Sequence, residues 1–113
     1  MKILNKEKGS ILANNAEVAK TPLKRAVGLL DRKSLSIGEA LIIQPCNSIH
    51  TFFMRFPIDV VFVDTENKVV RAIFSLKPFR ITAVYWKSKF VIELPAGTLQ
   101  NTSTVVGDSL IIE

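Results

Sequence analysis

The chain has 113 residues, 48% of them hydrophobic, which is enough for one domain with its own core. A single cysteine excludes an internal disulfide, and no apolar run approaches the roughly 20 residues of a membrane span, so we expect a single-domain cytoplasmic protein with no membrane attachment. The net charge is +5, and residues 1–56 hold the whole excess, with nine Lys and Arg against four acids. This bias favours an anionic ligand or an acidic protein as partner, and no recognised nucleic-acid motif accompanies it.

The first third of the chain predicts short strands followed by one helix. Residues 1–19 alternate apolar segments with Gly and Asn turn residues, which is typical of two or three short strands. Thr21 then has the chemistry of an N-cap, and Pro22 suits the first helical position. Apolar residues then recur at helical spacing, at Leu23, Ala26, Val27 and Leu30. We therefore predict one main helix over about residues 21–31. A basic cluster surrounds this helix: Lys20, Lys24, Arg25, Arg32 and Lys33.

The rest of the chain predicts strands. Residues 49–54 and 58–63 are rich in β-branched and aromatic residues, with a bend at Pro57 between them. Residues 58–63 and 69–76 flank a polar turn and should pair as an antiparallel hairpin, and residues 77–85 and 90–94 should form a second hairpin. A briefly helical or irregular connector and a closing strand follow. We therefore predict an α+β, mostly β fold: a small antiparallel barrel or sandwich of about eight short strands with one main helix.

Five blocks of the sequence carry a family resemblance: "RAVGLLDR", "IHTFFMRFPIDVVFVD", "LKPFR", "VIELPAGT" and "VVGDSL". In order and spacing they resemble the family called domain of unknown function 192, also named uncharacterised protein family 0127. The resemblance covers most of the chain from Arg25 to Leu110. It implies a compact β-rich single domain and assigns no catalytic role. The matching positions are Arg25, Gly28, Leu29, His50, Thr51, Met54, Pro57, Asp59, Leu94, Ala96, Gly97, Gly107 and Asp108.

The only cysteine and the only histidine lie close together in the sequence, at Cys46 and His50. Such a pair can serve nucleophilic catalysis, but in an extended segment their Cα atoms would be roughly 13 Å apart, so they meet only if the segment turns. The alternative for Cys46 is a small buried apolar side chain. A metal site would need further ligands such as Asp59 or Asp108, and we predict neither a metal nor a cofactor.

Asp59 interrupts an apolar strand and shares a face with Val61 and Val63. Burial of a carboxylate requires hydrogen bonds or a cation, so two interpretations arise. Asp59 lines a polar edge of a cleft with His50 and Thr51, or it is a structural residue that fixes the bend at Pro57.

We expect a domain that binds a small anionic ligand or an acidic partner in a cleft. The predicted ligand-binding residues are His50, Thr51, Met54, Arg55, Asp59, Arg25 and Arg80. One alternative is an enzyme, hydrolase-like or of another kind, with His50 as general base positioned by Asp59 and Cys46 or Thr51 nearby. Another is an interaction module that pairs through an exposed β edge. The sequence does not determine the oligomeric state.

Overall fold

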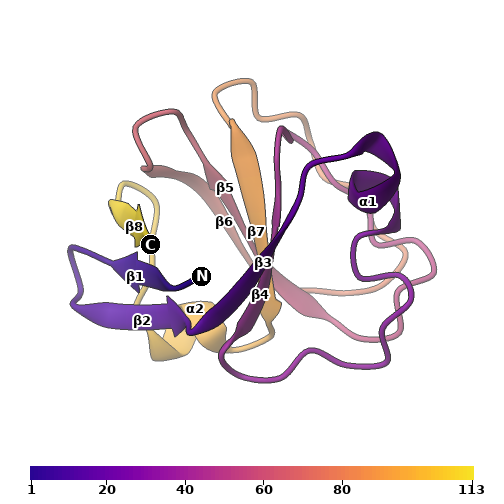
Figure 1. Cartoon of the computed structure of the whole chain (residues 1–113), viewed down its shortest axis with the longest axis horizontal. Helices are drawn as coiled ribbons and strands as arrows, with labels where there is room; N and C mark the ends of the chain where they lie inside the picture. Colours follow the sequence, from indigo (N-terminus) through magenta and orange to yellow (C-terminus); the bar gives the residue numbers. More distant parts are fainter.

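The computed structural model describes all 113 residues, and they form eight strands in two sheets with two short helices. The α+β, mostly β class is thus confirmed. The smaller sheet has the order β2-β1-β8, with β1 (Ile3–Asn5), β2 (Ser10–Ala13) and β8 (Leu110–Ile112). Figure 1 shows both termini beside this sheet. Lys2 and Glu113 exchange two backbone hydrogen bonds there, of 2.7 and 3.0 Å, so the ends of the chain are tied together.

The larger sheet has five strands in the order β3-β4-β7-β5-β6. They are β3 (Asn15–Ala19), β4 (Glu39–Ile43), β5 (Ile58–Val63), β6 (Val69–Leu76) and β7 (Phe90–Pro95). The predicted hairpin of β5 and β6 is confirmed, and all pairs in this sheet are antiparallel except β3 with β4. That pair is parallel because the chain between its strands crosses over through a helix. Neither sheet closes into a barrel.

The main helix, α1 (Pro22–Val27), is shorter than the predicted helix of residues 21–31. Thr21 is the N-cap as expected, and its hydroxyl accepts a hydrogen bond of 3.1 Å from the Lys24 amide. Gly28 ends the helix with φ 51° and ψ −121°, a conformation open to glycine and outside the helical region. The predicted apolar face is wrong as well, since no residue of α1 is buried and Leu23 is 74% exposed. Leu29, just after the helix, is buried instead.

Two further predictions about strands were wrong. Residues 49–54 form a turn, with a single β-bridge between His50 and Ile81, because Phe53 has a φ of 66° that no strand allows. Residues 77–89 form no strand, so the second predicted hairpin does not exist. Strand β7 instead lies between β4 and β5, which supply partners for both of its edges. The connector after β7 is briefly helical, as expected, and contains α2 (Thr98–Asn101).

Both faces of the larger sheet are buried, and each has its own core. On one face, the small sheet and α2 cover residues that include Ile42, Val61 and Leu94. On the other face, α1 and the loops that follow it lie over Leu41, Val60 and Val91. Strands β5 and β7 are therefore buried at every position. No helix of the structure has the length and apolar character needed to span a membrane.

Candidate functional site

A cavity of about 360 Å³ lies where α1 meets the larger sheet, and we call it the α1 cavity. Residues of α1, of segment 45–50, of β4 and of β7 line it. Its apolar wall consists mainly of Leu29, Ile43, Ile49 and Met54, and its polar groups come from Arg25, Cys46, Ser48, His50 and Glu93. This size and this mixture of surfaces are typical of sites for small molecules.

Arg25 reaches the cavity from α1 and is held in place at one end. Its Nη1 donates a hydrogen bond of 3.1 Å to the Pro45 carbonyl oxygen. Its Nε is buried and has no partner within the protein. The three ion pairs of the structure do not include Arg25, so its positive charge is not neutralised by a direct contact.

Glu93 is the most unusual residue of the cavity. It lies in the middle of β7, opposite Leu41 of β4 and Val60 of β5, on the face that α1 covers. Only 3% of the residue is exposed, and no hydrogen bond or ion pair within the protein reaches its carboxyl group. Burial raises the pKa of Glu93 from 4.5 to about 7, because the charged form loses its hydration.

Cys46 and His50 both line the α1 cavity, because segment 44–50 bends instead of running straight. The Cys46 thiol donates a hydrogen bond of 3.1 Å to the Ser48 carbonyl oxygen. Burial raises the pKa of this thiol above its ordinary value, so it is not an activated nucleophile. His50 is exposed, stacks on Phe52 with 5.4 Å between ring centres, and accepts a hydrogen bond of 3.3 Å at Nδ1 from the Phe52 amide.

Thr51 and Met54 are both buried, but only Met54 lines the cavity. The Thr51 hydroxyl donates to the Lys77 carbonyl oxygen at 2.7 Å and accepts from the Arg80 amide at 2.9 Å. The Thr51 backbone adds hydrogen bonds to Phe79 and Arg80. Thr51 thus joins turn 50–55 to turn 77–80.

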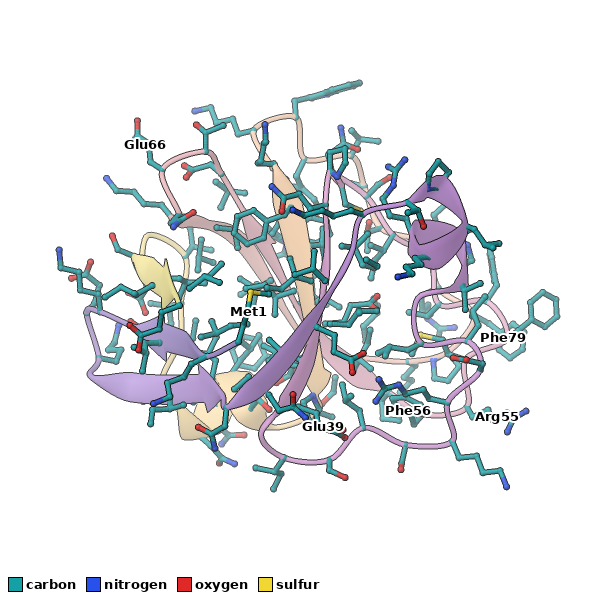
Figure 2. All side chains as sticks on the ribbon, in the orientation of Figure 1. Met1, Glu39, Arg55, Phe56, Glu66 and Phe79 are labelled. Carbon is teal, nitrogen blue, oxygen red and sulfur yellow. The ribbon has the colours of Figure 1, made fainter.

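Arg55 and Arg80 lie outside the α1 cavity. Both are exposed, and the Arg80 guanidinium contacts only the carbonyl oxygens of Pro78 and Phe79, at 3.5 and 3.4 Å. Figure 2 shows Arg55 and Phe79 at the periphery of the molecule, pointing away from the ribbon. Of the predicted basic residues, the structure brings only Arg25 to the cavity.

Asp59 lies on the opposite face of the sheet from Glu93 and is fully buried. Its Oδ1 accepts a hydrogen bond from the Ser75 amide at 2.8 Å. Its Oδ2 accepts two more, from Gly97 at 3.1 Å and Leu99 at 2.8 Å. Three backbone amides therefore satisfy this carboxylate, and no hydrogen bond joins it to His50. Asp59 thus links the start of α2 to β6, as a structural residue does.

Sequence reasoning missed Glu93, although the sequence carried a signal. In "FVIELP" a single acid interrupts an apolar strand at a position that shares its face with Val91. A charged residue inside a strand buried on both faces needs an explanation, because an unpaired buried charge is costly.

Comparisons with known proteins confirm the family resemblance. The model of the family DUF192, described as "Uncharacterized ACR", matches residues 3–112. A UPF0127 protein of Pyrococcus abyssi is 37% identical over 114 residues, which covers 96% of this chain and 94% of that protein. A UPF0127 protein of Pyrococcus furiosus is 33% identical, with 96% and 95% covered. A crystal structure of a protein of unknown function from Novosphingobium aromaticivorans superposes with a TM-score of 0.84 at 19% identity, covering 98% of this chain and 82% of that one, which shows a shared fold.

Proposed function

The chain belongs to the DUF192 family, and we propose that it acts as a binding domain for a small anionic ligand held in the α1 cavity. One observation carries the proposal. Two buried polar groups, Arg25 Nε and Glu93 Oε1, lack partners within the protein and line the same cavity. A buried polar group without a partner costs about 1–3 kcal/mol, so a ligand that satisfies both groups gains that free energy on binding.

The charges of the cavity favour an anion. Arg25 supplies a positive charge, whereas Glu93, with a pKa of about 7, is largely neutral in slightly acidic solution. In its neutral form the Glu93 carboxyl donates a hydrogen bond, as does the Arg25 Nε. A ligand with acceptor oxygens and a negative charge is complementary to these donors. The single, half-buried thiol agrees with a reducing cytoplasm as the place of action.

Arg25→Gln tests this proposal, with Lys24→Gln as a matched control. The two residues are neighbours on α1, and both substitutions remove one positive charge, but Lys24 is exposed and lines no part of the cavity. Acetate, benzoate, succinate and phosphate are added in turn, and the melting temperature is recorded. We expect at least one anion to raise the melting temperature of the wild type and of Lys24→Gln, but not of Arg25→Gln. If no anion raises the wild-type melting temperature, or if Arg25→Gln responds equally, the proposal fails.

A further inference from the structure

The surroundings of Glu93 limit the ligands that the α1 cavity accepts. Among the charged and titratable groups, Arg25, Cys46 and His50 share the cavity with it. Two further carboxylates lie on the same face of the sheet, because Glu17 pairs in register with Leu41 of β4, and Glu39 lies two residues before Leu41. Both are engaged by Arg32, at 3.3 and 3.6 Å. Arg25 is therefore the only Lys or Arg side chain that lines the cavity with Glu93.

Charge balance in the cavity favours a monoanion. One negative charge on the ligand is balanced by Arg25 when Glu93 carries a proton. A dianion such as phosphate would keep one negative charge without a partner in a largely buried site, which is costly. Phosphate sites also rely on several convergent backbone amides, and α1, with six residues, is too short to provide them.

The apolar wall gives the rest of the ligand its character. Leu29, Ile49 and Met54 are buried side chains whose surfaces face the cavity beside its polar groups. A ligand that extends along this wall gains hydrophobic contact in proportion to its apolar area. The volume of about 360 Å³ suits a molecule with a short body.

We propose that the ligand is a monocarboxylic acid with a short apolar body, and that Glu93 and the ligand carboxylate share one proton while Arg25 donates a hydrogen bond to the ligand. This inference rests on the proposed function and names its ligand class. One oxygen of the ligand accepts from Arg25 Nε, and the Glu93 hydroxyl donates to the other oxygen. Both groups that lack a partner in the protein are satisfied at once.

The shared proton makes binding depend on pH. Above a pH of about 7 the free protein loses the Glu93 proton, and the complex must then take up a proton from solution. The dissociation constant should therefore rise about tenfold for each pH unit above that value. Below it, binding should be nearly constant until the ligand itself becomes protonated.

Titration calorimetry with butyrate and benzoate between pH 6 and 9 tests the inference, with inorganic phosphate as the comparison. We expect both carboxylates to bind at every pH tested. At pH 8, where phosphate is mainly a dianion, phosphate should bind at least tenfold more weakly than the carboxylates, and about one proton should enter the carboxylate complex. Calorimetry in buffers of different ionisation enthalpy measures this uptake on the wild-type protein, so the test does not depend on any variant folding. In Glu93→Gln the side chain stays neutral, and the steep pH dependence should disappear while binding at pH 6 is retained.

His50→Gln is the matched control, because His50 also lines the cavity and its imidazole is a second side chain there that can carry a proton. It should keep the wild-type pH dependence. If His50→Gln abolishes that dependence and Glu93→Gln does not, the proton resides on the histidine and the inference is refuted. If phosphate binds as well as the carboxylates, or no proton is taken up, the ligand class is wrong although anion binding stands. If no anion binds at all, the proposed function itself fails.

Discussion

Asp59→Asn should destabilise the protein strongly while leaving the α1 cavity unchanged. Asp59 is fully buried, and its two oxygens accept three backbone amide hydrogen bonds, from Ser75, Gly97 and Leu99. An asparagine keeps one acceptor oxygen, which can serve the two amides at the start of α2. Its amino group must then face the Ser75 amide, so two donors meet and the Ser75 amide loses its partner.

The magnitude follows from these contacts. The new amino group at the fully buried position 59 has no acceptor, which costs about 1–3 kcal/mol, and the lost hydrogen bond to the Ser75 amide adds to this, so we expect a loss of about 3 kcal/mol in the free energy of unfolding. At roughly 4 °C per kcal/mol for a domain of this size, the melting temperature should fall by about 12 °C. Asp59→Ala would leave all three amides without an acceptor, at a cost on the order of 5 kcal/mol or more, which approaches the whole stability of a small domain. The asparagine variant is therefore the more informative one.

Asp64→Asn is the matched control. Asp64 also accepts two backbone amides, from Glu66 and Lys68 at 2.9 Å each, but both use the same oxygen, and the turn is exposed. Because the asparagine keeps that oxygen, the loss should stay below about 1 kcal/mol. Urea denaturation gives both values, and carboxylate titration of the folded variants reports on the cavity. The structural reasoning is refuted if the two variants lose equal stability, or if folded Asp59→Asn no longer binds the ligands of the wild type.

Two more predictions concern stability. Thr51→Val removes the hydroxyl that bonds to Lys77 and Arg80, and should lower the free energy of unfolding by about 2 kcal/mol, as measured by urea denaturation. Thr65→Val, at an exposed position, should change the urea midpoint little. Equal effects of the two substitutions would contradict the role given to Thr51. Since burial raises the pKa of Glu93 to about 7, ionisation of Glu93 opposes folding: with respect to this group the protein is most stable below pH 4.5 and loses stability as pH rises from 4.5 through 7. Between pH 5 and 8 the wild type should therefore lose about 2–3 kcal/mol that Glu93→Gln retains, and parallel pH profiles would refute this assignment.

Local patterns predicted the parts of the fold that depend on neighbours in sequence. The turn between β5 and β6 was recognisable from its polar residues, and Asn67, with φ 62°, adopts the left-handed conformation that such turns need. The N-cap at Thr21 was recognisable for the same reason. The length of α1 was not, because the positive φ of Gly28 ends the helix although an apolar residue at helical spacing follows it.

The pairing of β7 shows where local patterns stop being informative. A strand near a turn is expected to pair with the segment that precedes it, yet residues 77–89 form no strand and β7 joins two distant strands instead. The Thr51 hydrogen bonds hold residues 77–80 in a turn. These contacts span 26 and 29 residues of sequence, so no short-range pattern reveals them.

The candidate site was only partly predictable, for the same reason. Arg25, Cys46 and His50 come from the helix and a nearby loop, but Glu93 joins them from a strand more than 40 residues away. The rule that buried carboxylates need partners applied to both Asp59 and Glu93. The structure supplies three amides to Asp59 and no partner to Glu93.

The contrast between these two carboxylates supports a role for Glu93 outside folding. Both lie in the larger sheet at buried positions, one on each face. Asp59 offsets the cost of its burial with three hydrogen bonds, as a structural residue does. Glu93 has no such compensation, and a leucine or glutamine in its place would avoid the cost of an ionised carboxyl above pH 7. Residues that lower stability in this way are concentrated at functional sites, and Glu93 lines the same cavity as Arg25, whose charge has no ion-pair partner in the protein.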